Sequence, residues 1–161
     1  YRSSRGLGDV YKRQDINAVA HAHPIYGKTF STLNKELKPI TQDSCAFYKR
    51  TATFTDYDGV ANGPDEGINI AKALADKDFL ILQNHGILTT GSMVETTLWY
   101  FLNMEEACKS QLLAEAVGEP IVIPDKVAIH TRDYVANDLS AFASIQPLLD
   151  VLWEKEPEFL D

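Results

Sequence analysis

The chain has 161 residues, 45% of them hydrophobic and 24% charged, which is typical of one globular domain with a sizeable core. Its net charge of −8 argues against a nucleic-acid partner, because such binding depends on clustered Lys and Arg side chains that meet phosphates. No apolar run approaches the roughly 20 residues that span a bilayer, so no membrane partner is expected.

The first fourteen residues differ in composition from the rest of the chain. They hold four cations against one acid, and they lack the apolar periodicity of a helix or a strand. The segment resembles translated adapter sequence, and the alternative is a flexible basic arm. We therefore expect residues 1–14 to be non-native or disordered, with the domain in residues 15–161 and its native N-terminal part missing.

Residues 16–23 are predicted to form a strand that stops at Pro24, which cannot donate a hydrogen bond to a sheet. Residues 24–34 resemble a helix with the proline near its first turn. Residues 51–59 alternate in the manner of a strand and end at the turn pair Asp58-Gly59.

The next helix is predicted to begin at Asn62-Gly63-Pro64, which offers a cap and a proline in the first turn. Residues 78–91 indicate two short apolar strands around a turn at Asn84-His85-Gly86. Residues 92–95, Ser-Met-Val-Glu, are interpreted as a capping box that opens a long helix ending near Gly118. Its expected buried face consists of Val94, Leu98, Phe101, Leu102, Cys108 and Leu112.

One or two further helices are expected in residues 124–155. The two cysteines, Cys45 and Cys108, fit no metal-binding spacing. Such a sparse pair indicates reduced thiols and a cytoplasmic location.

Two histidines, His21 and His23, lie at the end of the first predicted strand. Side chains at i and i+2 leave the same face of a strand, with Cα atoms roughly 6.5–7 Å apart. Imidazoles at this spacing can tilt inward to share an ion about 2.0–2.1 Å from each nitrogen. A third ligand must come from elsewhere, and His85, in the predicted turn, is the candidate. Three neutral imidazoles with an open position describe a catalytic zinc site.

Each of these histidines also has an ordinary structural interpretation. A histidine pair can simply share one side of a sheet, and a histidine before glycine can simply belong to a turn. Periodicity and spacing leave both interpretations open. His130, in a polar helical stretch, is a weaker ligand candidate.

The segment AVAHAHPIYGKTFSTL, followed about sixty residues later by DFLILQNHGILTTGSMVETTLWYFLNMEEACKSQLLAEA, resembles the class II aldolase/adducin family. The resemblance covers roughly residues 15–117, and the C-terminal tail is similar to that of microbial members of unassigned substrate. It implies an α/β fold, namely a three-layer αβα sandwich around a mostly antiparallel sheet, here incomplete at the N-terminus.

The resemblance further implies that His21, His23 and His85 bind one divalent metal, usually zinc, with Fe²⁺, Mn²⁺ or Co²⁺ as alternatives. The implied activity is that of a metal-dependent lyase, which cleaves a small hydroxy-carbonyl substrate by a retro-aldol reaction through an enediolate. Related members epimerise, decarboxylate or use Fe(II) and oxygen at the same site. A non-catalytic adducin-like interaction domain is a further alternative, although adducin heads tend to lose the metal histidines.

The family's aldolases carry a glutamate about twenty residues before the histidine pair, but Tyr1 to Asp9 contain none. Activity of the chain as it stands is therefore an open question. Asp43 and Tyr134 are weak candidates for acid/base roles, since relatives place an acid and a tyrosine in comparable positions. The resemblance also implies a homo-oligomer, typically a cyclic tetramer.

Overall fold

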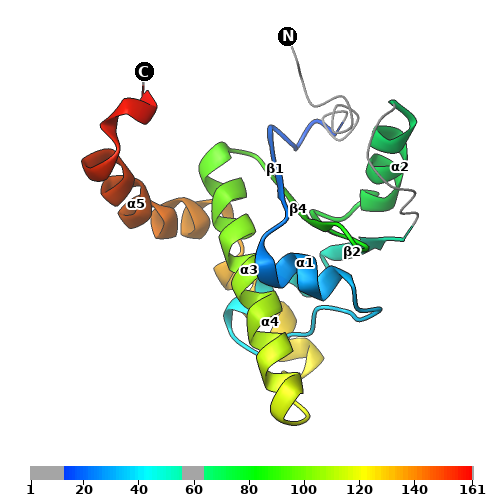
Figure 1. Cartoon of the computed structure of the whole chain (residues 1–161). Helices are drawn as coiled ribbons and strands as arrows, with labels where there is room; N and C mark the ends of the chain where they lie inside the picture. The colour runs from blue at the N-terminus through cyan, green and yellow to red at the C-terminus, as the bar shows by residue number, and fades with distance from the viewer. Residues whose placement is uncertain (1–12, 56–63, 161) are drawn as a thin grey trace.

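The computed structural model describes residues 13–55 and 64–160 (Figure 1). Four strands form one sheet in the order β1-β4-β3-β2, namely β1 (Ala18–Ala22), β2 (Thr51–Phe54), β3 (Phe79–Leu82) and β4 (Gly86–Gly91). The pairs β1–β4 and β3–β4 are antiparallel, and β2–β3 is parallel. The prediction of a mostly antiparallel sheet is confirmed.

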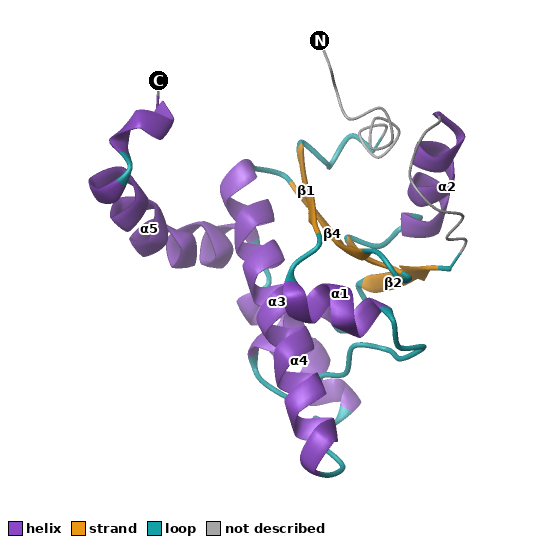
Figure 2. Ribbon diagram, viewed as in Figure 1, coloured by secondary structure: helices purple, strands orange, loops and turns teal. Residues whose placement is uncertain are grey.

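The side chains of β3 divide the core between the two faces of the sheet. Phe79 and Ile81 join a cluster with Phe30 of α1 (Ile25–Ser31) and Met104 of α3 (Val94–Val117). Leu80 and Leu82 face the other way, toward Ile70 and Leu74 of α2 (Pro64–Leu74). This two-residue alternation produces the predicted three layers, with α2 on one side and α1 and α3 on the other (Figure 2).

The beginning of α3 differs from the predicted capping box. Its N-cap residue is Met93, which makes no side-chain cap hydrogen bond. The hydroxyl of Ser92 instead pairs with the carboxylate of Asp138, with Oγ and Oδ2 2.6 Å apart. Ser92 therefore bonds to Asp138 of the C-terminal helix, although the local sequence pattern predicts that it caps α3.

The buried face of α3 is also rotated from the predicted one. Val94 is 70% exposed and Leu102 is 39% exposed, whereas Cys108 is buried as expected. The buried positions are Thr96, Thr97, Tyr100, Met104, Ala107, Cys108 and Gln111. The polar members are accommodated by hydrogen bonds: Gln111, for example, donates to the Glu36 carbonyl and accepts from the Lys38 N–H group.

Two helices, α4 (Asp125–Val135) and α5 (Asp138–Lys155), form a C-terminal extension of the chain, and they confirm the prediction of one or two helices in residues 124–155. α3 ends at Val117, and the predicted stop, Gly118, is its C-cap residue. In the view of Figure 1, α3 lies between the sheet and α5. No helix in the described part of the chain is both long and apolar enough to cross a membrane.

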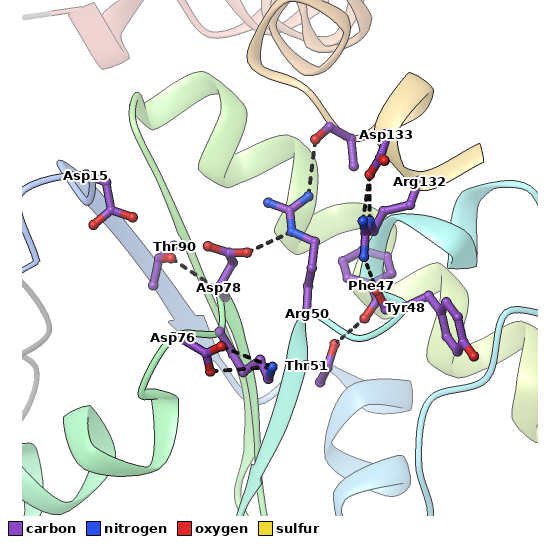
Figure 3. Close-up of polar contacts among 12 residues, drawn as sticks. Asp15, Phe47, Tyr48, Arg50, Thr51, Asp76, Asp78, Thr90, Arg132 and Asp133 are labelled. Atoms are coloured by element: carbon purple, nitrogen blue, oxygen red, sulfur yellow. Dashed lines mark hydrogen bonds and ion pairs between the residues drawn. The ribbon is translucent and has the colours of Figure 1, made fainter. Parts of the chain in front are cut away.

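Arg50 ties this extension to the sheet (Figure 3). Its Nε donates to Asp78 at 2.7 Å and its Nη1 donates to the carbonyl of Ala136, between α4 and α5, at 3.1 Å. The guanidinium also lies 5.0 Å from the ring centre of Phe79 and 5.4 Å from that of Tyr100. These contacts offset the desolvation cost of burying the Arg50 guanidinium.

Several sequence-based expectations fall partly or wholly on residues that the structure does not describe. The turn at Asp58-Gly59 and the cap at Asn62-Gly63 lie outside the described residues, as do residues 1–12 of the expected non-native segment. Within that segment, Arg13 is described and forms an ion pair with Asp15.

Candidate metal centre

The antiparallel pairing of β1 with β4 brings the three predicted histidines together. His21 lies opposite Leu88 of β4, and His23 follows β1 by one residue. Because the strands run in opposite directions, the end of β1 meets the beginning of β4. The turn that precedes β4 carries His85, so residues more than sixty positions apart become neighbours at one edge of the sheet.

The imidazole rings form a compact triangle. Their centres are 5.1 Å apart for His21 and His23, 4.9 Å for His21 and His85, and 4.5 Å for His23 and His85. One ligand nitrogen from each ring lies within 4.8 Å of the others. An ion shared at about 2.0–2.1 Å from each nitrogen requires its ligand atoms to be clustered in this way. The donor set therefore fits a divalent metal that accepts imidazole.

A backbone hydrogen bond orients the first ring of the triangle. Nδ1 of His21 lies 2.9 Å from the carbonyl oxygen of Ile87. Since a carbonyl can only accept, Nδ1 carries the proton and Nε2 keeps its lone pair for a ligand. Sequence reasoning missed this contact, because a backbone carbonyl gives no signal in side-chain identity.

The surroundings of His21 and His85 favour the neutral imidazole, which is the form that binds metals. Burial lowers the pKa of His21, an effect opposed by its hydrogen bond to the Ile87 carbonyl and reinforced by the nearby His23. The pKa of His85 is also lowered, first by burial and then by the proximity of His21 and His23.

The turn that carries His85 depends on backbone conformations that are rare for most residues. Asn84 has φ of 56°, in the left-handed region that asparagine tolerates better than most residues. A Cβ atom on Gly86 would lie 2.5 Å from the carbonyl oxygen of Ala22 and 3.1 Å from Cδ2 of His23. Only glycine therefore permits this approach of β4 to the end of β1.

Comparisons with known proteins show which family this chain belongs to. Residues 8–112 match the model of the class II aldolase and adducin N-terminal domain. The chain belongs to the class II aldolase/adducin family. The predicted resemblance is thereby confirmed, and so is the fold that it implied.

The similar proteins carry different activities in their names. The chain is 36% identical over 146 residues to the decarboxylase NovR of Streptomyces niveus, covering 91% of this chain and 54% of that protein. A 4-hydroxy-3-prenylphenylpyruvate oxygenase/4-hydroxy-3-prenylbenzoate synthase of Streptomyces roseochromogenus subsp. oscitans is also 36% identical over 146 residues, with 91% and 53% covered. The chain thus spans about half the length of these curated relatives.

Among solved structures, the L-fuculose 1-phosphate aldolase from Glaciozyma antarctica PI12 superposes with a TM-score of 0.82 at 34% identity. The alignment covers 93% of this chain and 57% of that one. The family is typically dependent on a divalent metal, in agreement with the donor set found here. The family match begins at residue 8, so the domain boundary at residue 15 stays a prediction.

The two acid/base candidates lie outside the triangle of histidines. Asp43 is exposed at the beginning of η2 (Asp43–Phe47), and Tyr134 is 77% exposed on α4. A cavity of about 450 Å³ is lined by Gln42, Ile123, His130, Thr131, Tyr134 and Val135. Within residues 13–55 and 64–160, no carboxylate joins the three histidines in a metal-binding group. The roles of Asp43 and Tyr134 therefore stay predictions.

Proposed function

We propose that this protein is a metal-dependent lyase that breaks a carbon–carbon bond next to the carbonyl group of a small substrate. The proposal is carried by the convergence of His21, His23 and His85. The family match and the names of two relatives, a decarboxylase and an aldolase, support it. The three histidines would be the metal ligands, and we infer zinc as the ion, with Fe²⁺, Mn²⁺ or Co²⁺ as alternatives.

The structure indicates which ring nitrogen of His21 is available to a metal. His21 would bind through Nε2, since its Nδ1 proton is held by the Ile87 carbonyl. Burial lowers the pKa of His21 and of His85 and so favours their neutral, ligating form. A bound divalent ion would act as a Lewis acid toward substrate oxygens and so stabilise negative charge that develops there.

The first candidate reaction is retro-aldol cleavage of a sugar-like hydroxy-carbonyl compound, either phosphorylated or not. The β-hydroxyl loses its proton to a base, the bond between the α and β carbons breaks, and an aldehyde leaves. The electron pair remains on the other fragment as an enediolate, which then takes up a proton. The base is unassigned, since no described carboxylate accompanies the triad.

The second candidate is decarboxylation of an oxo acid at the same site, including its Fe(II)- and oxygen-dependent form. It is favoured by the similarity to NovR and to the oxygenase/synthase, both over 91% of this chain. Loss of carbon dioxide also leaves an electron pair next to a carbonyl, so one site could support either reaction. Epimerisation through a related enolate is a further alternative. A non-catalytic adducin-like role is less well supported, because all three histidines are present.

The experiment that separates these candidates loads the metal-free protein with zinc or with iron in turn. Aldehyde release from L-fuculose 1-phosphate reports retro-aldol cleavage, carbon dioxide release from a 3-oxo acid reports decarboxylation, and oxygen consumption reports the iron-dependent reaction. A His85→Ala variant is the control. Because the chain spans about half the length of these relatives, the assay is also run on a longer clone. A protein that binds no divalent metal would contradict the proposal.

We further propose a cytoplasmic homo-oligomer, with a tetramer as the expected assembly by analogy with the family. Cys45 and Cys108 are both free and buried, in keeping with a reducing compartment. Light scattering coupled to size-exclusion chromatography measures the mass of the assembly directly.

A further inference from the structure

Glu105 of α3 contacts the first turn of α1, which begins two residues after His23. Its Oε1 accepts a hydrogen bond from the N–H of Tyr26 at 2.8 Å, and its Oε2 accepts one from the N–H of Gly27 at 2.5 Å. These are the second and third residues of α1, whose first N–H groups have no partner inside the helix. Pro24, the N-cap, provides no side-chain cap. The carboxylate of another helix therefore takes the place of a local cap.

This contact fixes α1 beside the end of β1. His23 is separated from α1 by Pro24 alone, and the N–H of Lys28 closes the first turn on the Pro24 carbonyl at 2.8 Å. The ring constrains the backbone of Pro24. A displacement of α1 relative to α3 would therefore move the backbone that carries His23.

The same helix also packs on the residue that orients His21. A Cβ atom on Gly27 would lie 2.9 Å from Cγ2 of Ile87, so the backbone of α1 rests directly on that side chain. The Ile87 carbonyl is the acceptor for Nδ1 of His21. Glu105 thus holds α1 where it supports two of the three histidines, although Glu105 is not one of the metal ligands proposed here.

From these contacts we propose that Glu105 is a positioning residue for the metal site. The inference rests on the proposed metal-binding function and assigns to it a residue outside the histidine set. The neighbouring Glu106 has no such role: it forms an exposed pair with Lys109 of the same helix, at 3.2 Å.

The test is a titration of the metal-free 161-residue protein with Co²⁺, followed by visible absorption. Glu105→Gln keeps the size of the side chain, but it replaces one acceptor oxygen with an NH₂ group that would face a backbone N–H. We expect the Kd for Co²⁺ to rise about 10–100-fold, as for other residues that support metal ligands. We also expect a changed absorption spectrum at saturating Co²⁺. The matched control, Glu106→Gln, should leave both unchanged.

A purely structural role for Glu105 predicts a different result. In that case the melting temperature would fall, while the folded variant would bind Co²⁺ with the wild-type Kd and spectrum, and the inference would be overturned. If Glu105→Gln does not fold, the same Co²⁺ titration is made with Gly27→Ala. Its added methyl group would push α1 away from Ile87 and so test whether the position of α1 affects the metal site. A Gly27→Ala protein with wild-type Kd and spectrum would likewise overturn the inference. Failure of the wild-type protein to bind Co²⁺ would instead refute the proposed function itself.

Discussion

The Nδ1 atom of His21 lies 2.9 Å from the carbonyl oxygen of Ile87, and this contact links the sheet to the candidate metal site. Ile87 belongs to β4, the strand that pairs with β1, and its carbonyl sets the tautomer of His21. The geometry of the site is therefore determined by the strand pairing, because the same pairing places His85 beside His21 and His23.

Gly86 should tolerate no side chain. A Gly86→Ala substitution places a methyl group against the Ala22 carbonyl and the His23 ring, so strand or ring must move. We expect the free energy of unfolding to fall by about 1–3 kcal/mol, as for other overpacked positions. Metal affinity should fall as well, since His23 is displaced.

The control for this change is Gly118→Ala. A Cβ atom on Gly118 meets nothing within 4 Å, and its φ of 171° is extended backbone. Urea denaturation compares the two variants. Equal stability of Gly86→Ala and the wild-type protein would show that β4 does not approach β1 as described.

Glu115 should contribute to stability above about pH 4.5 and lose this contribution in more acidic solution. Hydrogen bonds from Lys35 and then from Gln111 and Lys38 lower its pKa from 4.5 to about 2. A carboxyl with a depressed pKa in the folded state stabilises the fold above its unfolded pKa, and the effect disappears as pH falls through the folded pKa.

Thermal melts between pH 6 and pH 2 provide the measurement. Glu115→Gln should lose part of the wild-type decline in melting temperature between about pH 4.5 and pH 2, whereas Glu119→Gln, at an exposed position, should retain it. Identical pH profiles for wild type and Glu115→Gln would show that the lysine contacts do not persist in solution.

Cys108 should be inert toward thiol reagents while the protein is folded. Its side chain is fully buried, and this burial, with a smaller effect of Glu105, raises its pKa to about 12. Since the thiolate is the reactive form, labelling should require unfolding. Cys45 is also fully buried, and burial raises its pKa too, so both thiols should react only in denaturant. Rapid labelling of either thiol in native buffer would contradict the described core.

The candidate site was predictable from sequence because its motifs are local. His21 and His23 share a strand face by simple alternation, and His85 stands between Asn84 and Gly86 in a recognisable turn. Their convergence could not be read from periodicity, which says nothing about which strands pair. It came instead from the family resemblance, and the structure then showed the pairing of β1 with β4.

The errors arose where tertiary contacts override local pattern. Apolar side chains such as Val94 and Leu102 were expected inside, yet α3 turns Thr97 and Gln111 toward the core. Threonine and glutamine can be buried at such positions when each finds a hydrogen-bond partner. A pattern of side chains does not reveal these partners, because they are backbone groups or lie far away in the sequence. The local pattern likewise predicts Ser92 as a helix cap, because its partner Asp138 lies 46 residues further along the chain.

Metal stoichiometry tests the central claim most directly. The protein is purified without chelators, and its content of zinc, iron, manganese and cobalt is measured by mass spectrometry alongside a His85→Ala variant. A His130→Ala variant, altered at an exposed histidine outside the triangle, is the control. We predict close to one divalent ion per chain in the wild type and the control, and almost none in His85→Ala. Equal metal content in all three proteins, or none in the wild type, would contradict the account.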